Sequence, residues 1–489
     1  MPVLRVYQCK LISQMAISRF SYSFLLASVL MFSAYAQDDQ VFVQRDNNKI
    51  VIRNRSGVSS FDVETRGKIE LTDDDRDVKS MSLDGYLEIK KTVFGSRRVI
   101  LITNEGGTLK KEYYEGRTKI DFEPDGKAWL GEVLPELVRS TTIAADGRVE
   151  RFFKKGGPNA VLNEIDRLES NHVKAHYANL LMKRPINQKD YPHIIDELAS
   201  TIDSNHYLAG FLKDNLDKFI KSKEALEAAF RATNNMDSDH YRTEVIKQGL
   251  EAQPVSLDAV KIIMKSAGEM DSDHYKTEVL SSLLRQDNLN DEIVQEMIIT
   301  SRTIDSDYYR SVVLNKALSK EGLSNTSFQR ALESIKDIDS DHYKTEVLKS
   351  LMSKPIPQDL QLTLIDLTGS IDSDHYCTVV LEEMMERQKI ENQVLNRLIS
   401  RASYLDSDHY SSMVMKDALS RNINDEGIIS ILQAAERIDS DHYLTEVLTA
   451  AAPKVRNGSS ALKDAYRSAA HRITSETYYG RAMRALDPN

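Results

Sequence analysis

The chain has 489 residues, a formal net charge of −10 and an apolar content of 41%. This length exceeds what one compact hydrophobic core normally holds, so we expect two or more structural units. The composition is typical of a folded chain rather than a disordered one. Because an acidic surface repels nucleic acids and anionic lipids, the sequence predicts neither as a partner.

Residues 1–36 have the pattern of a secretory signal peptide. Positive charge at Lys10 and Arg19 precedes the apolar run of residues 24–32, and Ala34-Tyr35-Ala36 supplies small residues for cleavage. The apolar run is short for a membrane anchor, and acidic residues follow it at once. We therefore expect an exported protein, periplasmic or secreted, with no membrane insertion after signal cleavage. Cys377 would then be the only cysteine, which excludes an intramolecular disulfide.

Residues 37–125 are predicted to form a β-rich domain of six to eight mostly antiparallel strands. Five runs alternate apolar and polar residues, with glycine turn signals between them. These runs are residues 50–52, 61–63, 68–71, 86–89 and 99–102. The acidic run at residues 73–77 lacks the spacing of an EF-hand, so we interpret it as a solvated turn rather than a calcium loop.

Part of this region resembles the extracytoplasmic C-terminal region of BlaR-type membrane metallopeptidases. The similarity spans about residues 57–185, and helical repeats follow in those proteins too. The matching stretches are residues 67–74, 78–82, 85–89, 128–130 and 133–137. The chain has no His-Glu-x-x-His motif. The resemblance therefore implies a sensor-like or interaction region without its enzyme.

Residues 126–168 are predicted to form a helical junction. Apolar residues between Leu130 and Val138 lie on one face of a helix over residues 126–142, which should cover the β domain. The segments 149–155 and 158–168 are interpreted as an incomplete helix pair, with Pro158 near the start of its second member.

From residue 169 to residue 489, one motif recurs at spacings of 33 or 34 residues. Its full form is Asp-Ser-Asp-His-Tyr, and degraded copies at Glu169 and Thr474 flank the series. The copies begin at Asp203, Asp237, Asp271, Asp305, Asp339, Asp372, Asp406 and Asp439. A fixed period in this range is typical of stacked repeats with terminal caps.

Each repeat is predicted to be a helix-turn-helix pair that is too small to fold by itself. In the repeat that begins at Asp271, helices over 272–285 and around 293–298 flank a turn at 288–291. A valine four residues after each tyrosine marks the stacking column. The predicted fold class is therefore α+β multidomain: a small antiparallel β domain, then a right-handed, HEAT-like α-solenoid of about ten 33–34-residue helix-turn-helix repeats.

Three interpretations of the motif are open. In the structural one, Asp271 or Ser272 caps the first helical turn, and His274 and Tyr275 pack on the next repeat. In the second, the motif forms a ladder that binds a partner. The third, metal binding or catalysis, is disfavoured, because equivalent histidines in adjacent repeats are too far apart to share one metal ion. We predict no cofactor and no metal site.

The candidate partner-binding residues are the motif histidines and the aspartates before them. They are His206, His240, His274, His342, His375, His409 and His442, with Asp239, Asp273, Asp341, Asp408 and Asp441.

The sequence predicts a non-enzymatic, exported scaffold that binds a protein or peptide along the solenoid, in envelope sensing or assembly. The alternative is a hydrolase or metal-binding protein with a site between the β domain and the first repeats. It would need a cluster of titratable groups outside the motif column. His176, His193 and His471 are the only histidines outside that column, and nothing in the sequence brings them together. A third hypothesis is a pH-responsive solenoid, since histidines titrate near neutral pH.

Overall fold

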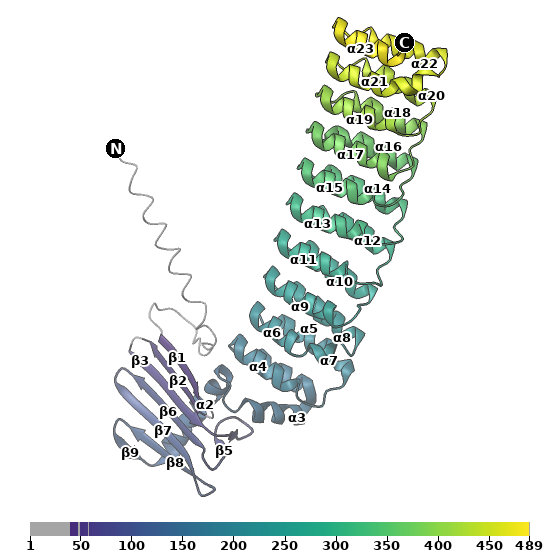
Figure 1. Ribbon diagram of the computed structural model, residues 1–489. Helices are drawn as coiled ribbons and strands as arrows, with labels where there is room; N and C mark the ends of the chain where they lie inside the picture. Colours follow the sequence, from purple (N-terminus) through teal and green to yellow (C-terminus); the bar gives the residue numbers. More distant parts are fainter. Residues whose placement is uncertain (1–39, 47–48, 57, 489) are drawn as a thin grey trace, which may run out of the picture. The chain divides into compact units, whose positions relative to one another are not determined.

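The computed structural model describes residues 40–46, 49–56 and 58–488 (Figure 1). The predicted signal peptide lies outside these residues. The chain divides into two compact units, residues 1–249 (unit 1) and residues 250–489 (unit 2). The division falls inside helix α9 (Asp239–Ala252), within the predicted solenoid.

The described part of unit 1 begins with nine antiparallel strands. The sequence predicted six to eight, so the observed number exceeds the upper bound by one. A seven-stranded sheet and a separate two-stranded hairpin, β4 with β5, contain these strands. The sheet order is β1 (Gln40–Asp46), β2 (Lys49–Ser56), β3 (Ser59–Arg66), β6 (Tyr86–Val93), β7 (Ser96–Glu105), β8 (Thr108–Glu115) and β9 (Thr118–Ile120); the hairpin pairs β4 (Ile69–Leu71) with β5 (Val78–Met81). The three residues of β9 are all exposed and do not alternate between apolar and polar, so the sequence pattern does not predict this strand.

One face of the sheet carries the core of this domain. The strand register aligns a buried row across β2, β3, β6, β7 and β8: Ile52, Val63, Ile89, Ile100 and Tyr113. Helix α2 (Lys127–Ser140) belongs to the same core, and the rings of Trp129 and Tyr113 lie 5.9 Å apart. The helix predicted at residues 126–142 therefore covers the sheet as expected.

The remaining helices of unit 1 form a second core that runs from Ala145 to Val245. They are α3 (Ala145–Asp166), α4 (Asn171–Leu181), α5 (Tyr191–Thr201), α6 (Asn205–Asp214), α7 (Leu216–Phe219), α8 (Lys223–Ala232) and the start of α9. Helix α3 is interrupted at Gly156 and Gly157, and Gly157 has φ of +62°, a conformation that glycine adopts without strain. The predicted incomplete helix pair corresponds to the two parts of α3.

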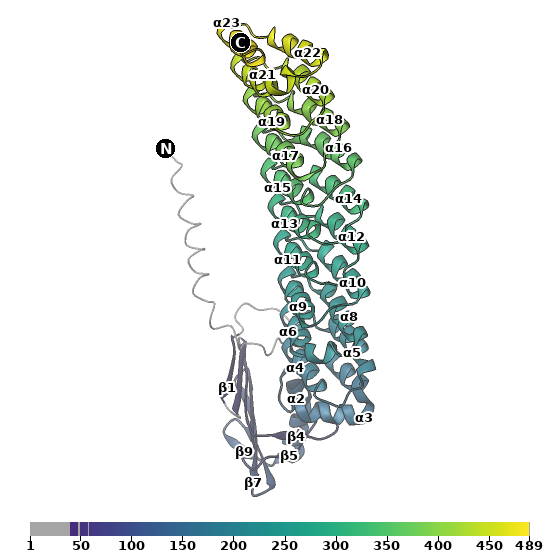
Figure 2. The ribbon, with the colours of Figure 1, turned by 45° about the vertical axis from the view of Figure 1, so that its right-hand side comes forward.

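Unit 2 is a stack of helix pairs, as predicted. Figure 2 shows its odd-numbered and even-numbered helices in two columns, each helix beside the equivalent helix of the next repeat. The odd column is α11 (Asp273–Leu283), α13 (Asp307–Leu318), α15 (Asp341–Leu351), α17 (Asp374–Arg387), α19 (Asp408–Ser420), α21 (Asp441–Arg456) and α23 (Glu476–Leu486). The even column is α10 (Leu257–Gly268), α12 (Asp291–Ser301), α14 (Asn325–Lys336), α16 (Gln358–Leu367), α18 (Asn392–Ala402), α20 (Asp425–Ala435) and α22 (Ser460–Ala470).

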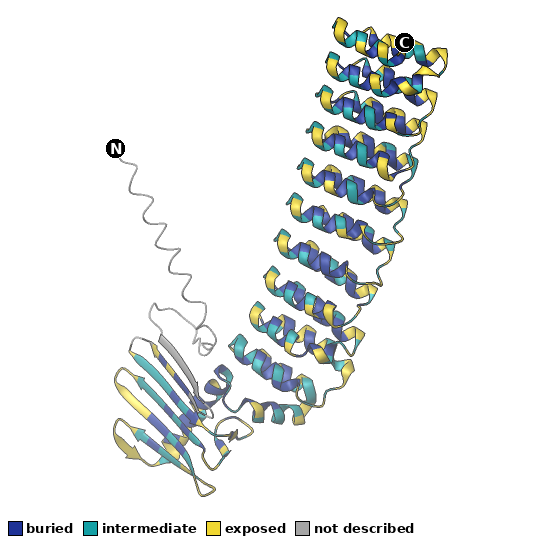
Figure 3. Ribbon diagram, viewed as in Figure 1, coloured by how far each residue is buried: buried dark blue, intermediate teal, exposed yellow. Residues whose placement is uncertain are grey.

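The predicted valine column is buried throughout unit 2. Its members are Val279, Val313, Val347, Val380, Val414 and Val447, all 0% exposed. In Figure 3 the exposed residues gather at helix ends and in the connecting loops. Because a helix pair has apolar residues on both of the faces that meet its neighbours, stacking supplies the burial that a single pair lacks.

Candidate functional site

The Asp-Ser-Asp-His-Tyr motif begins the odd-numbered helices of unit 2. Its serine is the N-cap residue, but the side chains of Ser272, Ser306 and Ser340 accept no capping hydrogen bond. These serines have ψ of 116–120°, whereas Asn290, a cap whose side chain does bond, has ψ of 166°. The predicted capping by the motif serine is therefore wrong in these three repeats, because at ψ of 116–120° the serine side chain makes no hydrogen bond to the first helical turn.

The third residue of the motif instead binds the loop that precedes the first helix of the next repeat. Asp273 accepts hydrogen bonds from the backbone N–H groups of Asp305 (3.2 Å) and Ser306 (2.8 Å). Asp307 does the same with Asp339 (3.1 Å) and Ser340 (2.7 Å). Asp341, Asp374, Asp408 and Asp441 continue the series. Each carboxylate thereby fixes the loop that positions the following motif.

The asparagines of unit 1 make a weaker version of this contact. Asn171 accepts one hydrogen bond from the N–H of Asp203 (3.0 Å), and Asn205 accepts one from Asp237 (3.2 Å). A neutral amide oxygen replaces the carboxylate there. Because hydrogen bonds to charged groups are the stronger class, the contact should be firmer in unit 2.

The histidines and tyrosines of the motif form a continuous row of rings in unit 2. The ring centroid of His274 lies 5.1 Å from Tyr275 and 5.8 Å from Tyr309 of the next repeat. Tyr308, which replaces the histidine once, keeps the row, 5.1 Å from Tyr309 and 5.8 Å from Tyr343. The row continues through His342, Tyr376, His375, Tyr410, His409, Tyr443, His442 and Tyr478. The predicted packing of His274 on the neighbouring repeat is confirmed.

Unit 1 contains a shorter row of the same kind. His206 lies 5.1 Å from Tyr207 and 5.8 Å from Tyr241, and its Nδ1 is 3.2 Å from the Tyr241 hydroxyl. His240 lies 5.2 Å from Tyr241, and Asp239 is the first residue of α9. Within each unit, the candidate residues predicted from the sequence therefore lie along one edge.

This edge, which we call the ladder, is open to solvent. In each full copy of the motif, the first aspartate and the fourth-position ring are exposed, and the tyrosine is half-buried. The side chain of His442, for example, is 47% exposed and lies 3.5 Å from Glu446. Hydrogen bonds from Thr474 and Ser475 to Asp441 hold the pKa of that carboxyl below its usual value.

Cations beside the tyrosines were missed by the sequence analysis. Lys276 donates to the carbonyl of Thr303 (2.8 Å), and Lys344 donates to the carbonyl of Ser370 (3.0 Å). Both acceptors lie within three residues after the second α-helix of the repeat, near a C-terminus where free carbonyls and the helix dipole favour a positive charge. The recurrence of Lys or Arg directly after the tyrosine was the available signal.

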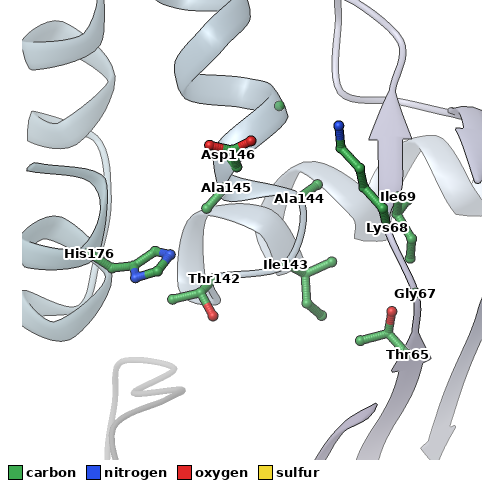
Figure 4. A pocket seen from close by; sticks show the side chains of 11 residues that line it. Thr65, Gly67, Lys68, Ile69, Thr142, Ile143, Ala144, Ala145, Asp146 and His176 are labelled. Atoms are coloured by element: carbon green, nitrogen blue, oxygen red, sulfur yellow. The ribbon is translucent and has the colours of Figure 1, made fainter. Parts of the chain in front are cut away.

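A hollow of about 220 Å³ lies in unit 1 between the β domain and the start of α3. Figure 4 shows His176, from α4, on one side of the hollow and Lys68, the residue before β4, on the other. Asp146 also lines it, but its carboxylate pairs with Arg184 at 2.6 Å. His193 lines a different hollow, and His471 stacks on Tyr479 in unit 2. Within unit 1, His176 and His193 are thus not brought to one site.

The predicted solvated turn at residues 73–77 is wrong for Asp75, which is 7% exposed. Asp75 accepts from Arg148 Nη2 (2.9 Å), and Arg151 Nη2 lies 2.5 Å from its other oxygen. Arg148 is itself 1% exposed and also contacts Glu164 and Tyr177. Burial alone would lower the pKa of Arg148, but Tyr177, Asp75 and Glu164 together raise it. The hairpin loop is therefore anchored to α3 and α4.

Among the described residues, none of the helices is both long and apolar enough to cross a membrane. The same residues contain no group of three or more His, Cys, Asp or Glu side chains arranged to hold a metal ion.

No protein-family model matches the chain, and no curated protein matches it. Among solved structures, it is similar to a protein from "Computational Design of Self-Assembling Cyclic Protein Homooligomers", at 15% sequence identity. The alignment covers 57% of this chain and 93% of that chain, with a TM-score of 0.12. A similarity at this score carries no argument about function.

Proposed function

We propose that the protein is an exported, non-enzymatic scaffold that binds a protein or peptide partner along the ladder, in envelope sensing or assembly. One observation carries the proposal: the same exposed aspartate and exposed ring recur at every full motif. A solenoid that repeats one exposed surface offers an extended binding site whose contacts add along its length. The pattern of residues 1–36 supports export.

The test compares two triple variants. The ladder variant carries His342→Ala, His375→Ala and His409→Ala. The control variant carries Asp359→Asn, Glu391→Gln and Asp425→Asn, exposed positions at the starts of the second helices of the same repeats. Proteins captured from an envelope extract of the source organism are identified, purified and titrated against all three forms. We expect the ladder variant alone to lose about tenfold or more in affinity, equal to about 1.4 kcal/mol.

The alternative function, a hydrolase or metal-binding protein, has one supporting observation. The hollow lined by Lys68 and His176 lies where this alternative requires a site. Metal analysis of the purified protein tests the metal-binding form, with His176→Ala as the comparison. Stoichiometric metal that the variant loses would favour this alternative over the scaffold.

A further inference from the structure

We propose that the ladder of unit 2 binds a basic peptide in an extended polyproline-II conformation, with lysine or arginine at every third residue. This inference rests on the proposed function, because it names the chemistry of the partner for the same surface. Four features of the ladder carry it: the constancy of its exposed aspartates, its charge, its aromatic rings, and the spacing of its rungs.

The first aspartate of the motif recurs without change along unit 2. The first aspartate is exposed in all six copies of unit 2, at Asp271, Asp305, Asp339, Asp372, Asp406 and Asp439. Ten residues further along the chain, on the helix that follows each of these aspartates, the residue changes through Ser281, Asn315, Lys349, Glu382, Lys416 and Thr449. Tyr308 keeps the row of rings intact, so ring packing alone does not require histidine at the other copies.

The charge of the ladder favours a cationic partner. Each motif places two carboxylates at a helix N-terminus, whose dipole is equivalent to only about half a positive charge. Cations offset this charge only in part. Lys276, Arg310 and Lys344 follow the motif tyrosines and donate to backbone carbonyls, so each places one positive charge beside two carboxylates. In the other three full copies of unit 2, the uncharged Cys377, Ser411 and Leu444 take that position. Each rung therefore keeps a net negative charge.

The rings add a second means of holding a cation. The guanidinium of Arg437 lies 4.1 Å from the ring centroid of Tyr404, so the chain itself makes a cation–π contact in this region of the repeat. Aromatic faces attract Lys and Arg side chains in this way, and the exposed Tyr308 and the half-buried motif tyrosines offer equivalent rings.

The spacing of the rungs determines the conformation of the peptide. Neighbouring helices pack roughly 8–10 Å apart, so one rung follows another at about that distance. A polyproline-II helix rises about 3.1 Å per residue with three residues per turn, which places residues i, i+3 and i+6 on one face about 9 Å apart. A β-strand alternates its faces with a period of two, so side chains three residues apart would point alternately toward the ladder and away from it.

The experiment measures fluorescence anisotropy of labelled synthetic peptides titrated with the purified protein. The probe is six repeats of Lys-Pro-Pro. The comparison peptides are six repeats of Glu-Pro-Pro and two peptides that also carry six lysines, placed at every second or every fourth residue with proline between them. We expect the Lys-Pro-Pro peptide to bind at least about tenfold more tightly than each of the others, and more weakly as salt rises.

The triple variants separate local contact from general charge. A variant with Asp339→Asn, Asp372→Asn and Asp406→Asn should weaken binding about tenfold. The control at Asp359, Glu391 and Asp425 removes the same formal charge from the same repeats and should change the affinity for the Lys-Pro-Pro peptide by less than about twofold. Far-UV circular dichroism establishes that each variant is folded, and His375→Gln with His409→Gln provides a second, milder ladder change that should also weaken binding.

Each contrary outcome overturns a stated part of the proposal. Equal binding of the respaced peptides contradicts the three-residue period, and tighter binding of the Glu-Pro-Pro peptide contradicts the charge. Equal losses in the ladder and control variants contradict the location. If no peptide binds while a purified partner still depends on the ladder histidines, this inference fails and the proposed function stands.

Discussion

Arg148 is the least exposed of the buried charged residues in the described structure. It is 1% exposed, and it contacts Asp75 and Glu164 from β4–β5 and α3. Asp75 has φ of +58°, a conformation that aspartate tolerates better than most residues. A charge in such a place is stable only while its partners remain charged and close.

Replacing Arg148 should destabilise the fold strongly. Arg148→Met leaves two buried carboxylates without their main partner, and we expect a loss of about 3–5 kcal/mol in the free energy of unfolding. Urea denaturation followed by circular dichroism measures it. Arg98→Met is the matched control, because Arg98 is 51% exposed and pairs loosely with Glu115, so its loss should stay below about 1 kcal/mol. Similar losses in both variants would contradict the role of the buried cluster.

At the scale of the element, backbone groups near both ends of the first helix of a repeat are hydrogen-bonded by side chains of neighbouring repeats. The third-position aspartate binds backbone N–H groups of the following repeat, and a cation such as Lys320 reaches the carbonyl of Gln286 in the preceding one (2.9 Å). Negative groups thus lie at helix N-termini and positive groups at C-termini, as the helix dipole favours. The motif therefore has two roles. Its third-position aspartate connects one repeat to the next, a contact that we call the joint, and its first aspartate and fourth-position ring form an exposed surface.

A single aspartate should test this joint. Asp341→Ala removes the acceptor for the N–H groups of Asp372 and Ser373, and we expect a loss of about 1–2 kcal/mol in unfolding free energy. Asp339→Ala, a change at the exposed first position of the same motif, should cost less than about 0.5 kcal/mol. Thermal and urea unfolding of the two variants measure the difference. A larger effect at Asp339 would contradict the assignment.

Acid should weaken the joints. Hydrogen bonds hold the pKa of Asp441 low, and hydrogen bonds from Ser324 and Ser327 outweigh burial to lower the pKa of Asp291. A carboxyl whose pKa is lower in the folded chain stabilises it above the unfolded pKa, near 4, and this contribution is lost as pH falls through the folded value. Urea midpoints measured from pH 7 to pH 3 should therefore fall below about pH 4.5. The difference between the wild-type chain and Asp441→Asn should shrink over the same range, and a constant difference would contradict this.

At the scale of the whole molecule, the repeats of unit 2 contact mainly their immediate neighbours. Equivalent helices recur at a constant period, so the surface that one repeat presents to the next is similar in every repeat, and one repeat can take the place of another. We expect such an array to tolerate the loss of one whole repeat better than the loss of part of a repeat, because a partial deletion puts the remaining helices out of register with their neighbours.

Deletion of one full period tests this property. Removing residues 305–338 joins Ile304 to Asp339 and restores the motif sequence, so we expect a folded helical protein with a lower unfolding midpoint. Removing only residues 305–321 breaks the phase and should abolish cooperative unfolding of unit 2. Circular dichroism melts compare the two deletions. Equal stability of both would mean that the repeats do not stack in register.

The sequence alone determined the period, the helix pairs, the buried valine column and the antiparallel β domain, because these follow from local spacing and apolar pattern. Only the tertiary structure decided which group each polar side chain binds. Asp273 bonds residues 32 and 33 positions away, and Asp75 meets Arg148 across 73 positions. A polar side chain has many possible partners along a chain, and only the stacking distance and the fold of the hairpin select one of them.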